Sequence, residues 1–94
     1  MASAEGISQP VEIVNRRGLH ARASARLARE AGNFDARITV CKDDTCVIAT
    51  SIMGLMMLGA AKGDTVTIQA SGDDQDQALA GIVDLISDRF GEAE

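Results

Sequence analysis

The residue best suited to chemistry in this sequence is its only histidine, His20, which lies within a cluster of arginines. The fourteen residues 16–29 include five arginines and no carboxylate, which gives this stretch a formal charge of +5. Because the formal net charge of the chain is −5, the remainder carries −10. Exposed charges more than about 8 to 10 Å apart are largely screened at cellular salt, so the cluster acts as a local site for an anion.

The surroundings of His20 favour a phosphoryl group as that anion. Imidazole is a nucleophile near neutral pH, and a phosphorylated imidazole can pass its phosphoryl group onward. His20 precedes an alanine-rich segment typical of a helix, and the unpaired N–H groups and positive dipole end of a helix start attract phosphate oxygens. Arg17 and Arg22 are near enough along the chain to contribute forked donors. The alternative is that His20 only caps the helix and the arginines are solvated.

A second segment with functional potential is the short helical stretch after Ser51, which is apolar on nearly every side. If Leu55 and Leu58 point inward, an outer face remains, formed by Ile52, Met53 and Met56. Exposed methionine-rich surfaces adapt to several partners, which favours a docking surface over the alternative of a fully buried helix.

Ser51 is predicted to be the N-cap of that helix, a role worth about 1 kcal/mol. It is also a candidate for phosphorylation, which would place about two negative charges beside the docking surface without unfolding the helix. Both interpretations stay open on the sequence.

Several other functions are excluded by composition. One histidine and no glycine-rich nucleotide loop leave no hydrolytic, metal or nucleotide constellation, so we expect no metal and no cofactor. An acidic chain with two phenylalanines and no tyrosine or tryptophan is a poor partner for nucleic acid. No apolar run reaches the roughly 18 residues that cross a bilayer, and no secretion signal begins the chain, so we expect no membrane association and a cytoplasmic location. The carboxylates are scattered at turns and helix starts, where capping and solvation explain them.

The pattern of apolar residues predicts a single domain over residues 1–94, with residues 1–8 as a frayed tail. Period-two segments predict four strands, at 11–14, 36–41, 45–49 and 65–70. Helical spacing predicts three helices, at 21–31, from 51 to about 59, and from about 74 to 90. Antiparallel strands with core residues on one face require helices on that face alone, which makes an α+β open-faced sandwich.

Helical spacing also predicts how the first helix is rotated. Its core-facing residues are expected to be Ala21, Ala25, Ala28 and either Leu27 or Ala31. The arginines at 22, 26 and 29 then form a solvated stripe on one flank.

The two cysteines, Cys41 and Cys46, are expected to face each other across a turn at Asp43 and Asp44. A non-hydrogen-bonded pair places its Cα atoms ~4.5 Å apart, which makes a disulfide sterically conceivable. The reducing cytoplasm argues against that bond, and a single histidine does not complete a zinc site. We therefore expect two reduced thiols, with a redox role as the less favoured alternative.

Two segments resemble those of the HPr family, the histidine-containing phosphocarriers of the bacterial phosphoenolpyruvate-dependent phosphotransferase system. Residues Gly18 to Arg22 resemble its active-site signature, and Ser51 to Asp64 resemble its regulatory-serine segment. The spacing between the two also matches, and the likeness runs from about Pro10 to Phe90. The resemblance implies a sheet with strand order 1-4-2-3.

The resemblance also implies a function, in which His20 accepts a phosphoryl group on Nδ1 from phospho-enzyme I and gives it to IIA domains. Arg22 would orient the phosphate, and Ser51 would be modified by HPr kinase/phosphorylase where that enzyme is present. We expect a monomer whose partner-binding residues are Ala21, Ala25, Ile52, Met53 and Met56.

The chain departs from the family pattern after Arg22, where proline is usual and Ala23 and Ser24 stand here. This departure predicts a looser helix start. Whether the carrier serves sugar uptake or a nitrogen and stress-linked branch stays open. The alternative of a different class is a non-catalytic regulatory module, controlled at Ser51, in which His20 plays no part.

Overall fold

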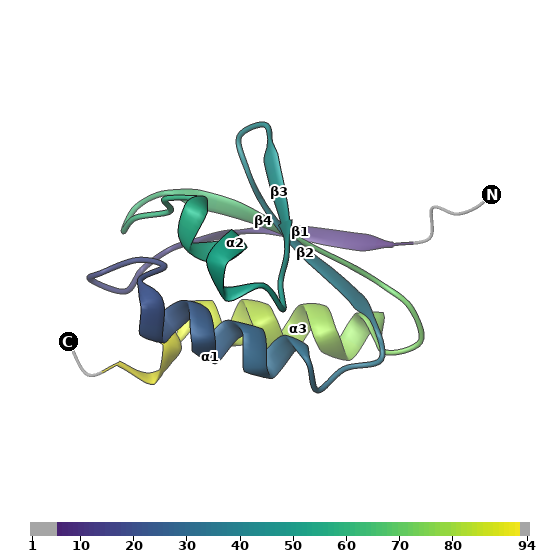
Figure 1. Ribbon diagram of the computed structural model, residues 1–94. Helices are drawn as coiled ribbons and strands as arrows, with labels where there is room; N and C mark the ends of the chain where they lie inside the picture. The colour runs from purple at the N-terminus through teal and green to yellow at the C-terminus, as the bar shows by residue number, and fades with distance from the viewer. Residues whose placement is uncertain (1–5, 93–94) are drawn as a thin grey trace.

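The computed structural model describes residues 6–92, and these form one antiparallel sheet covered by helices (Figure 1). The strands are β1 (Ile7–Glu12), β2 (Arg37–Lys42), β3 (Thr45–Ile48) and β4 (Thr65–Ser71). The helices are α1 (Ala21–Ala31), α2 (Ile52–Met57), α3 (Gln75–Ser87) and a 3-10 turn, η1 (Arg89–Gly91). The strand order is β1-β4-β2-β3, so the predicted open-faced sandwich and its topology are confirmed. Within residues 6–92, no helix combines the length and apolar character that a bilayer span requires.

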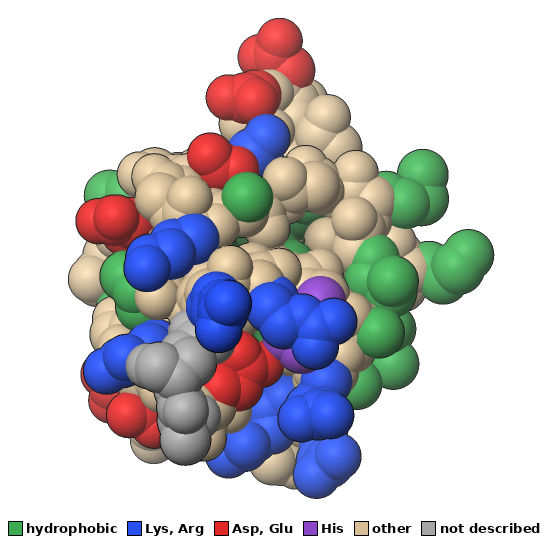
Figure 2. Space-filling model, turned by 90° about the vertical axis from the view of Figure 1, so that its left-hand side faces the viewer, with side chains coloured by type: hydrophobic (Ala, Val, Ile, Leu, Met, Phe, Trp, Pro, Cys, Tyr) green, Lys and Arg blue, Asp and Glu red, His purple; other side chains and the backbone are tan. Residues whose placement is uncertain are grey.

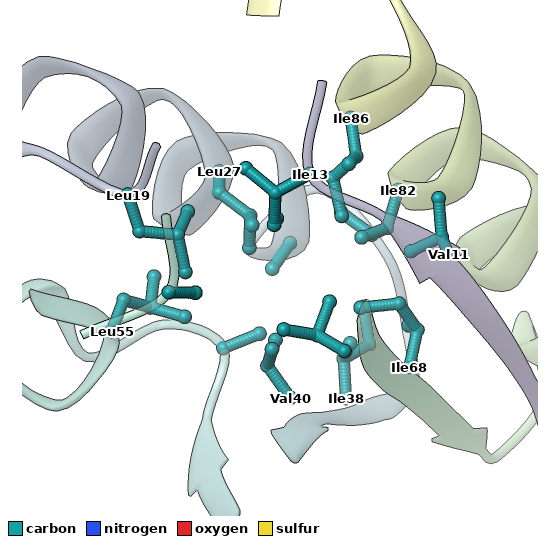
Figure 3. Packing of buried hydrophobic residues seen from close by; sticks show 14 of the residues in the cluster. Val11, Ile13, Leu19, Leu27, Ile38, Val40, Leu55, Ile68, Ile82 and Ile86 are labelled. Carbon is teal, nitrogen blue, oxygen red and sulfur yellow. The ribbon is translucent and has the colours of Figure 1, made fainter. Parts of the chain in front are cut away.

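The hydrophobic core lies between the sheet and the helices (Figure 3). Its largest fully buried aliphatic side chains are Ile13, Leu27, Leu55, Ile68, Ile82 and Ile86. Truncating such a leucine or isoleucine to alanine costs about 2–5 kcal/mol. At one end of the core, Leu19 and Leu55 point toward each other, which fixes the loop before α1 against α2.

The hairpin of β2 and β3 has the predicted register. Lys42 lies opposite Thr45 and Cys41 opposite Cys46, so the turn falls at Asp43 and Asp44. Asp43 takes a φ of 54°, a conformation that aspartate tolerates better than most residues.

The prediction that Cys41 and Cys46 are reduced thiols is wrong, because the structure joins them in a disulfide. Their Cα atoms lie 4.0 Å apart across the hairpin. Strand pairing places the two cysteines directly opposite each other, and this proximity favours the bond more than the expected reducing surroundings oppose it.

The first strand begins earlier than predicted. Residues 1–8 were expected to form a tail, but β1 includes Ile7 and Ser8, and Ile7 pairs with Ala70. Backbone pairing with the long strand β4 extends β1 beyond the part that the sequence predicts. The added residues show no apolar alternation, and Pro10 is tolerated because β1 is an edge strand. Residues 1–5 of the predicted tail lie outside the described residues.

The rotation of α1 also differs from the prediction. Its buried residues are Ala23, Ser24, Leu27 and Ala31, whereas Ala21 is exposed. Leu27 is the only large apolar residue of the helix and is completely buried. Small residues three and four positions from it therefore share the core face, and Ala25 and Ala28 are only half-buried.

The chain leaves α3 before the predicted end at Phe90. Helical spacing continues to that residue, but α3 ends at Ser87, and Arg89 and Phe90 have φ of 56° and 55°. Phe90 is still buried, so the reversal preserves the apolar contact that the spacing indicated. It also directs the chain back toward the start of α1 (Figure 1).

Candidate functional site

His20 lies at the start of α1, at the end of a tightly held loop. Gly18 has a φ of +64°, and a Cβ added there would lie 2.4 Å from the carbonyl oxygen of Ala60. Only glycine fits this position without displacing the backbone. The N–H of Leu19 donates to the same carbonyl at 3.0 Å. The loop is therefore fixed against the segment that follows α2.

The first turn of α1 is held by Ser24, one residue after the position where the resembled family has proline. The N–H of Ser24 donates to the carbonyl of His20 at 2.9 Å, and its hydroxyl donates to the carbonyl of Leu19 at 3.2 Å. Ser24 and Ala23 are both completely buried. These contacts offset the looseness that the sequence predicted for this helix start.

The imidazole of His20 contacts a residue that sequence reasoning missed, Glu92. Its Nε2 lies 2.7 Å from Oε2 of Glu92, and each side chain is 16% exposed. Nδ2 of the buried Asn15 donates to Oε1 of Glu92 at 3.3 Å. The two contacts join segments more than 70 residues apart in the chain. No local pattern signals such a pairing, and the prediction that capping and solvation explain all the carboxylates is wrong for Glu92.

The pKa of the Glu92 carboxyl lies below its ordinary value. Partial burial acts to raise this pKa, but hydrogen bonds from His20 and Asn15 and the positive charges of His20 and Arg22 outweigh that effect. Glu92 is therefore a carboxylate at neutral pH. A neutral His20 ring must donate its proton to this carboxylate at Nε2.

Arginine side chains surround the histidine on one side of the molecule (Figure 2). Arg17 and Arg22, the two predicted phosphate contacts, are exposed. The three arginines of the predicted solvated stripe, at positions 22, 26 and 29, are all exposed, and Nη1 of Arg26 also donates to the carbonyl of Phe90 at 3.2 Å. Arg17 and Arg22 thus place exposed positive charge close to His20 in the chain. Arg26 instead holds the C-terminal turn through its hydrogen bond to Phe90.

The face of α2 beside this site is apolar and exposed. Ser51 is the N-cap as predicted, because its Oγ accepts a hydrogen bond from the N–H of Gly54 at 3.0 Å. Leu55 and Leu58 are buried in the core, as predicted. The other large apolar residues of α2 are exposed, so the alternative of a fully buried helix is wrong. The exposed residues are Ile52 (43%), Met53 (71%), Met56 (45%) and Met57 (81%). Met57 was missed, although the same spacing argument could have included it.

Comparison with known proteins agrees with this fold and site. A family model described as "PTS HPr component phosphorylation site" matches residues 7–88. The chain is 44% identical over 88 residues to the phosphocarrier protein HPr of Neisseria meningitidis, covering 94% of this chain and 99% of that protein. It is 41% identical to the phosphocarrier protein NPr of Shewanella violacea, covering 93% and 96% of the two chains. The solved structure of HPr-C-His from Thermoanaerobacter tengcongensis superimposes with a TM-score of 0.89 at 43% identity, covering 94% of this chain and 99% of that one.

The fold, the site and these relatives define the protein as a phosphocarrier. The chain belongs to the HPr family of the phosphotransferase system. Membership implies phosphohistidine chemistry, a connection with sugar transport and partners drawn from the same system.

Proposed function

We propose that His20 is the phosphoryl acceptor, which takes the group on Nδ1 from phospho-enzyme I and passes it to IIA-type proteins. The observation that carries this proposal is the position of the ring, at the start of α1 with basic side chains and exposed hydrophobic side chains beside it (Figure 2). A carrier needs a nucleophile that a protein donor can reach, with cationic groups for the phosphate and an apolar surface for the partner.

Arg22 orients the bound phosphate, and Arg17 adds a second cationic contact. Both side chains are exposed and lie within three residues of His20 along the chain. Guanidinium groups offer paired donors that match phosphate oxygens, and the first N–H groups of α1 add further donors. These groups bind the phosphate through hydrogen bonds alone, so they do not prevent its transfer to the next protein.

Enzyme I and the IIA domains dock on one shared surface, formed by Ala21, Ala25, Ile52, Met53 and Met56. Four of these residues are exposed and Ala25 is half-buried. Ala21 directly follows His20, and exposed hydrophobic side chains lie beside the histidine (Figure 2). Because donor and acceptor need the same face in turn, the carrier works as a monomer and a single domain. The carrier acts in the cytoplasm, where it binds both partners.

Ser51 is the regulatory position, modified by HPr kinase/phosphorylase where the cell has that enzyme. Its hydroxyl caps α2 and is half-buried next to Ile52 and Met53. Phosphate on this hydroxyl adds about two negative charges at the edge of the docking surface. It therefore weakens docking of partners that are attracted to the arginines.

The test is phosphorylation of the purified protein with enzyme I and phosphoenolpyruvate. The wild-type chain is expected to gain one acid-labile phosphate, and the His20→Ala variant is expected to gain none. Labelling of His20→Ala at the wild-type level would overturn the assignment. Normal growth and regulation in a His20→Ala strain would instead favour the regulatory module controlled at Ser51.

A further inference from the structure

The turn that carries Glu92 has an unfavourable backbone conformation. Arg89 and Phe90 have φ of 56° and 55°, in the left-handed region that residues other than glycine rarely adopt. Such a conformation is strained and persists only where its surroundings determine it. Here Phe90 is buried in the core, and Arg26 of α1 donates to its carbonyl at 3.2 Å. The turn is therefore held against α1 despite its strain.

This turn brings the Glu92 carboxylate to two groups in the loop before α1. Oε2 lies 2.7 Å from Nε2 of His20, and Oε1 accepts from Nδ2 of Asn15 at 3.3 Å. Asn15 is itself fixed, because it is completely buried and its Nδ2 also donates to the carbonyl of Gly18 at 2.8 Å. Each carboxylate oxygen thus has its own partner, which fixes the carboxylate relative to the imidazole ring.

We propose that Glu92 is a positioning residue for phosphoryl transfer, which holds the His20 ring through Nε2 so that Nδ1 faces the phosphoryl donor. This inference rests on the proposed function, in which His20 is the acceptor. A neutral imidazole has one N–H, and the carboxylate accepts it at Nε2, so the lone pair lies on Nδ1. Glu92 fixes both the proton and the ring orientation without contacting the phosphoryl group.

The transfer step needs no proton movement at the acceptor nitrogen. The Nδ1 lone pair of His20 forms an N–P bond while the N–P bond of the donor protein's phosphohistidine breaks, and that electron pair returns to the donor ring. The His20 ring keeps its proton on Nε2 and becomes a cation. The Glu92 carboxylate, 2.7 Å from Nε2, balances this charge as it develops.

The test compares Glu92→Ala and Glu92→Gln with the control Asp88→Asn. Asp88 is an exposed carboxylate four residues earlier, so its substitution removes the same charge without touching His20. Phosphoryl uptake from phospho-enzyme I is measured as a function of carrier concentration. We expect kcat to fall about tenfold in Glu92→Ala, because a loosened ring loses orientation. The loss should be smaller in Glu92→Gln, which keeps an acceptor oxygen, while KM and the Asp88→Asn variant stay at wild-type values.

NMR of the imidazole tests directly whether Glu92 holds the Nε2 proton of His20. In the wild type, the hydrogen bond to Glu92 should protect the Nε2 proton of His20 from exchange and make its resonance observable. In Glu92→Ala this resonance should be lost, while the backbone spectrum stays folded. Retention of the same resonance in Glu92→Ala would contradict the positioning role.

The outcomes separate this inference from the function on which it rests. If Glu92→Ala keeps the wild-type kcat, or loses only thermal stability, the contact is structural and the positioning role is wrong. An equal fall of kcat in Asp88→Asn would show that the loss of any nearby negative charge causes the effect, and this would also overturn the positioning role of Glu92. Failure of the wild type to gain phosphate, or labelling of His20→Ala, would instead overturn the assignment of His20.

Discussion

The starts of α1 and α2 differ in what they do with the side chain at the N-cap. At α2, the Ser51 hydroxyl accepts the N–H of Gly54 and so completes the first turn. At α1, His20 makes no side-chain cap, and its ring is turned to Glu92 instead. The serine therefore stabilises the fold, whereas the histidine leaves helix N–H groups without a side-chain acceptor. An unused cap of this kind costs stability but keeps donors available for an incoming phosphate.

The largest effect is expected when α1 is given the side-chain cap that α2 has. His20→Ser and His20→Ala should both abolish phosphorylation by enzyme I, because neither has an imidazole. Both also lose the contact with Glu92, so their difference isolates the cap. His20→Ser should unfold with a free energy about 1 kcal/mol higher than that of His20→Ala, measured by urea denaturation. Equal stability would show that the start of α1 cannot use a serine cap.

The next largest effect is expected from Arg22, which lies in the first turn of α1. Arg22→Ala should slow phosphoryl uptake on the order of 10- to 100-fold, because a charged donor to the transferred group is lost. Arg29→Ala, on an exposed position two turns further along α1, should stay near the wild-type rate. The measurement is the initial rate of labelling by phospho-enzyme I at fixed carrier concentration. Comparable losses in both variants would mean that overall positive charge, and not the position of Arg22, determines the rate.

The apolar face of α2 should govern binding where the start of α1 governs chemistry. Met53→Lys is expected to raise KM for enzyme I about tenfold, equivalent to about 1.4 kcal/mol of lost contact. Ile48→Lys is the matched control, because Ile48 is also exposed, at 42%, but lies on β3. Its KM should be unchanged. A similar rise in Ile48→Lys would extend the docking surface onto the sheet edge.

A smaller effect is expected at Ser51, because its role in the fold is a single hydrogen bond. Ser51→Ala should lower the free energy of unfolding by about 1 kcal/mol, with no change in the rate of phosphorylation at His20. Thr50→Ala, at the exposed neighbouring position, should leave stability unchanged. Urea denaturation and labelling by enzyme I test the two halves of this prediction. A slower labelling rate in Ser51→Ala would contradict the prediction that Ser51 stabilises the fold without affecting phosphorylation of His20.

Local features of the sequence were sufficient to predict much of this molecule. The bounds of α1, the turn at Asp43 and Asp44, and the cap at Ser51 each follow from residue types within a few positions. The outer face of α2 was also predictable, because a short domain cannot bury a helix on every side. These features depend on periodicity and turn chemistry, which a single sequence contains.

Contacts between distant segments could not be predicted in the same way. The extension of β1 comes from pairing with β4, and the rotation of α1 comes from burying Leu27 in a core built by other elements. Glu92 is the clearest case, because its partner His20 is 72 residues away. The left-handed turn at Phe90 that joins them runs against the helical spacing of the sequence before it. Periodicity predicts a face of an element but not which remote residue will meet it.

The smallest effect is expected from the contact between Glu92 and His20, which should contribute less to stability in acid. The folded pKa of Glu92 is lowered, so its contribution is fully present above the unfolded pKa of about 4.3 and is lost as pH falls through the folded value. The groups that favour its charged form are His20, Asn15 and Arg22. The wild type should therefore exceed Glu92→Gln in free energy of unfolding at pH 5, by less than about 1 kcal/mol, because the pair is partly exposed. Denaturation with urea at intervals from pH 5 to pH 2 should show this difference shrinking. A difference that stayed constant over that range would mean that Glu92 stabilises the C-terminal turn through packing, and that its charge on the His20 ring contributes nothing to the fold.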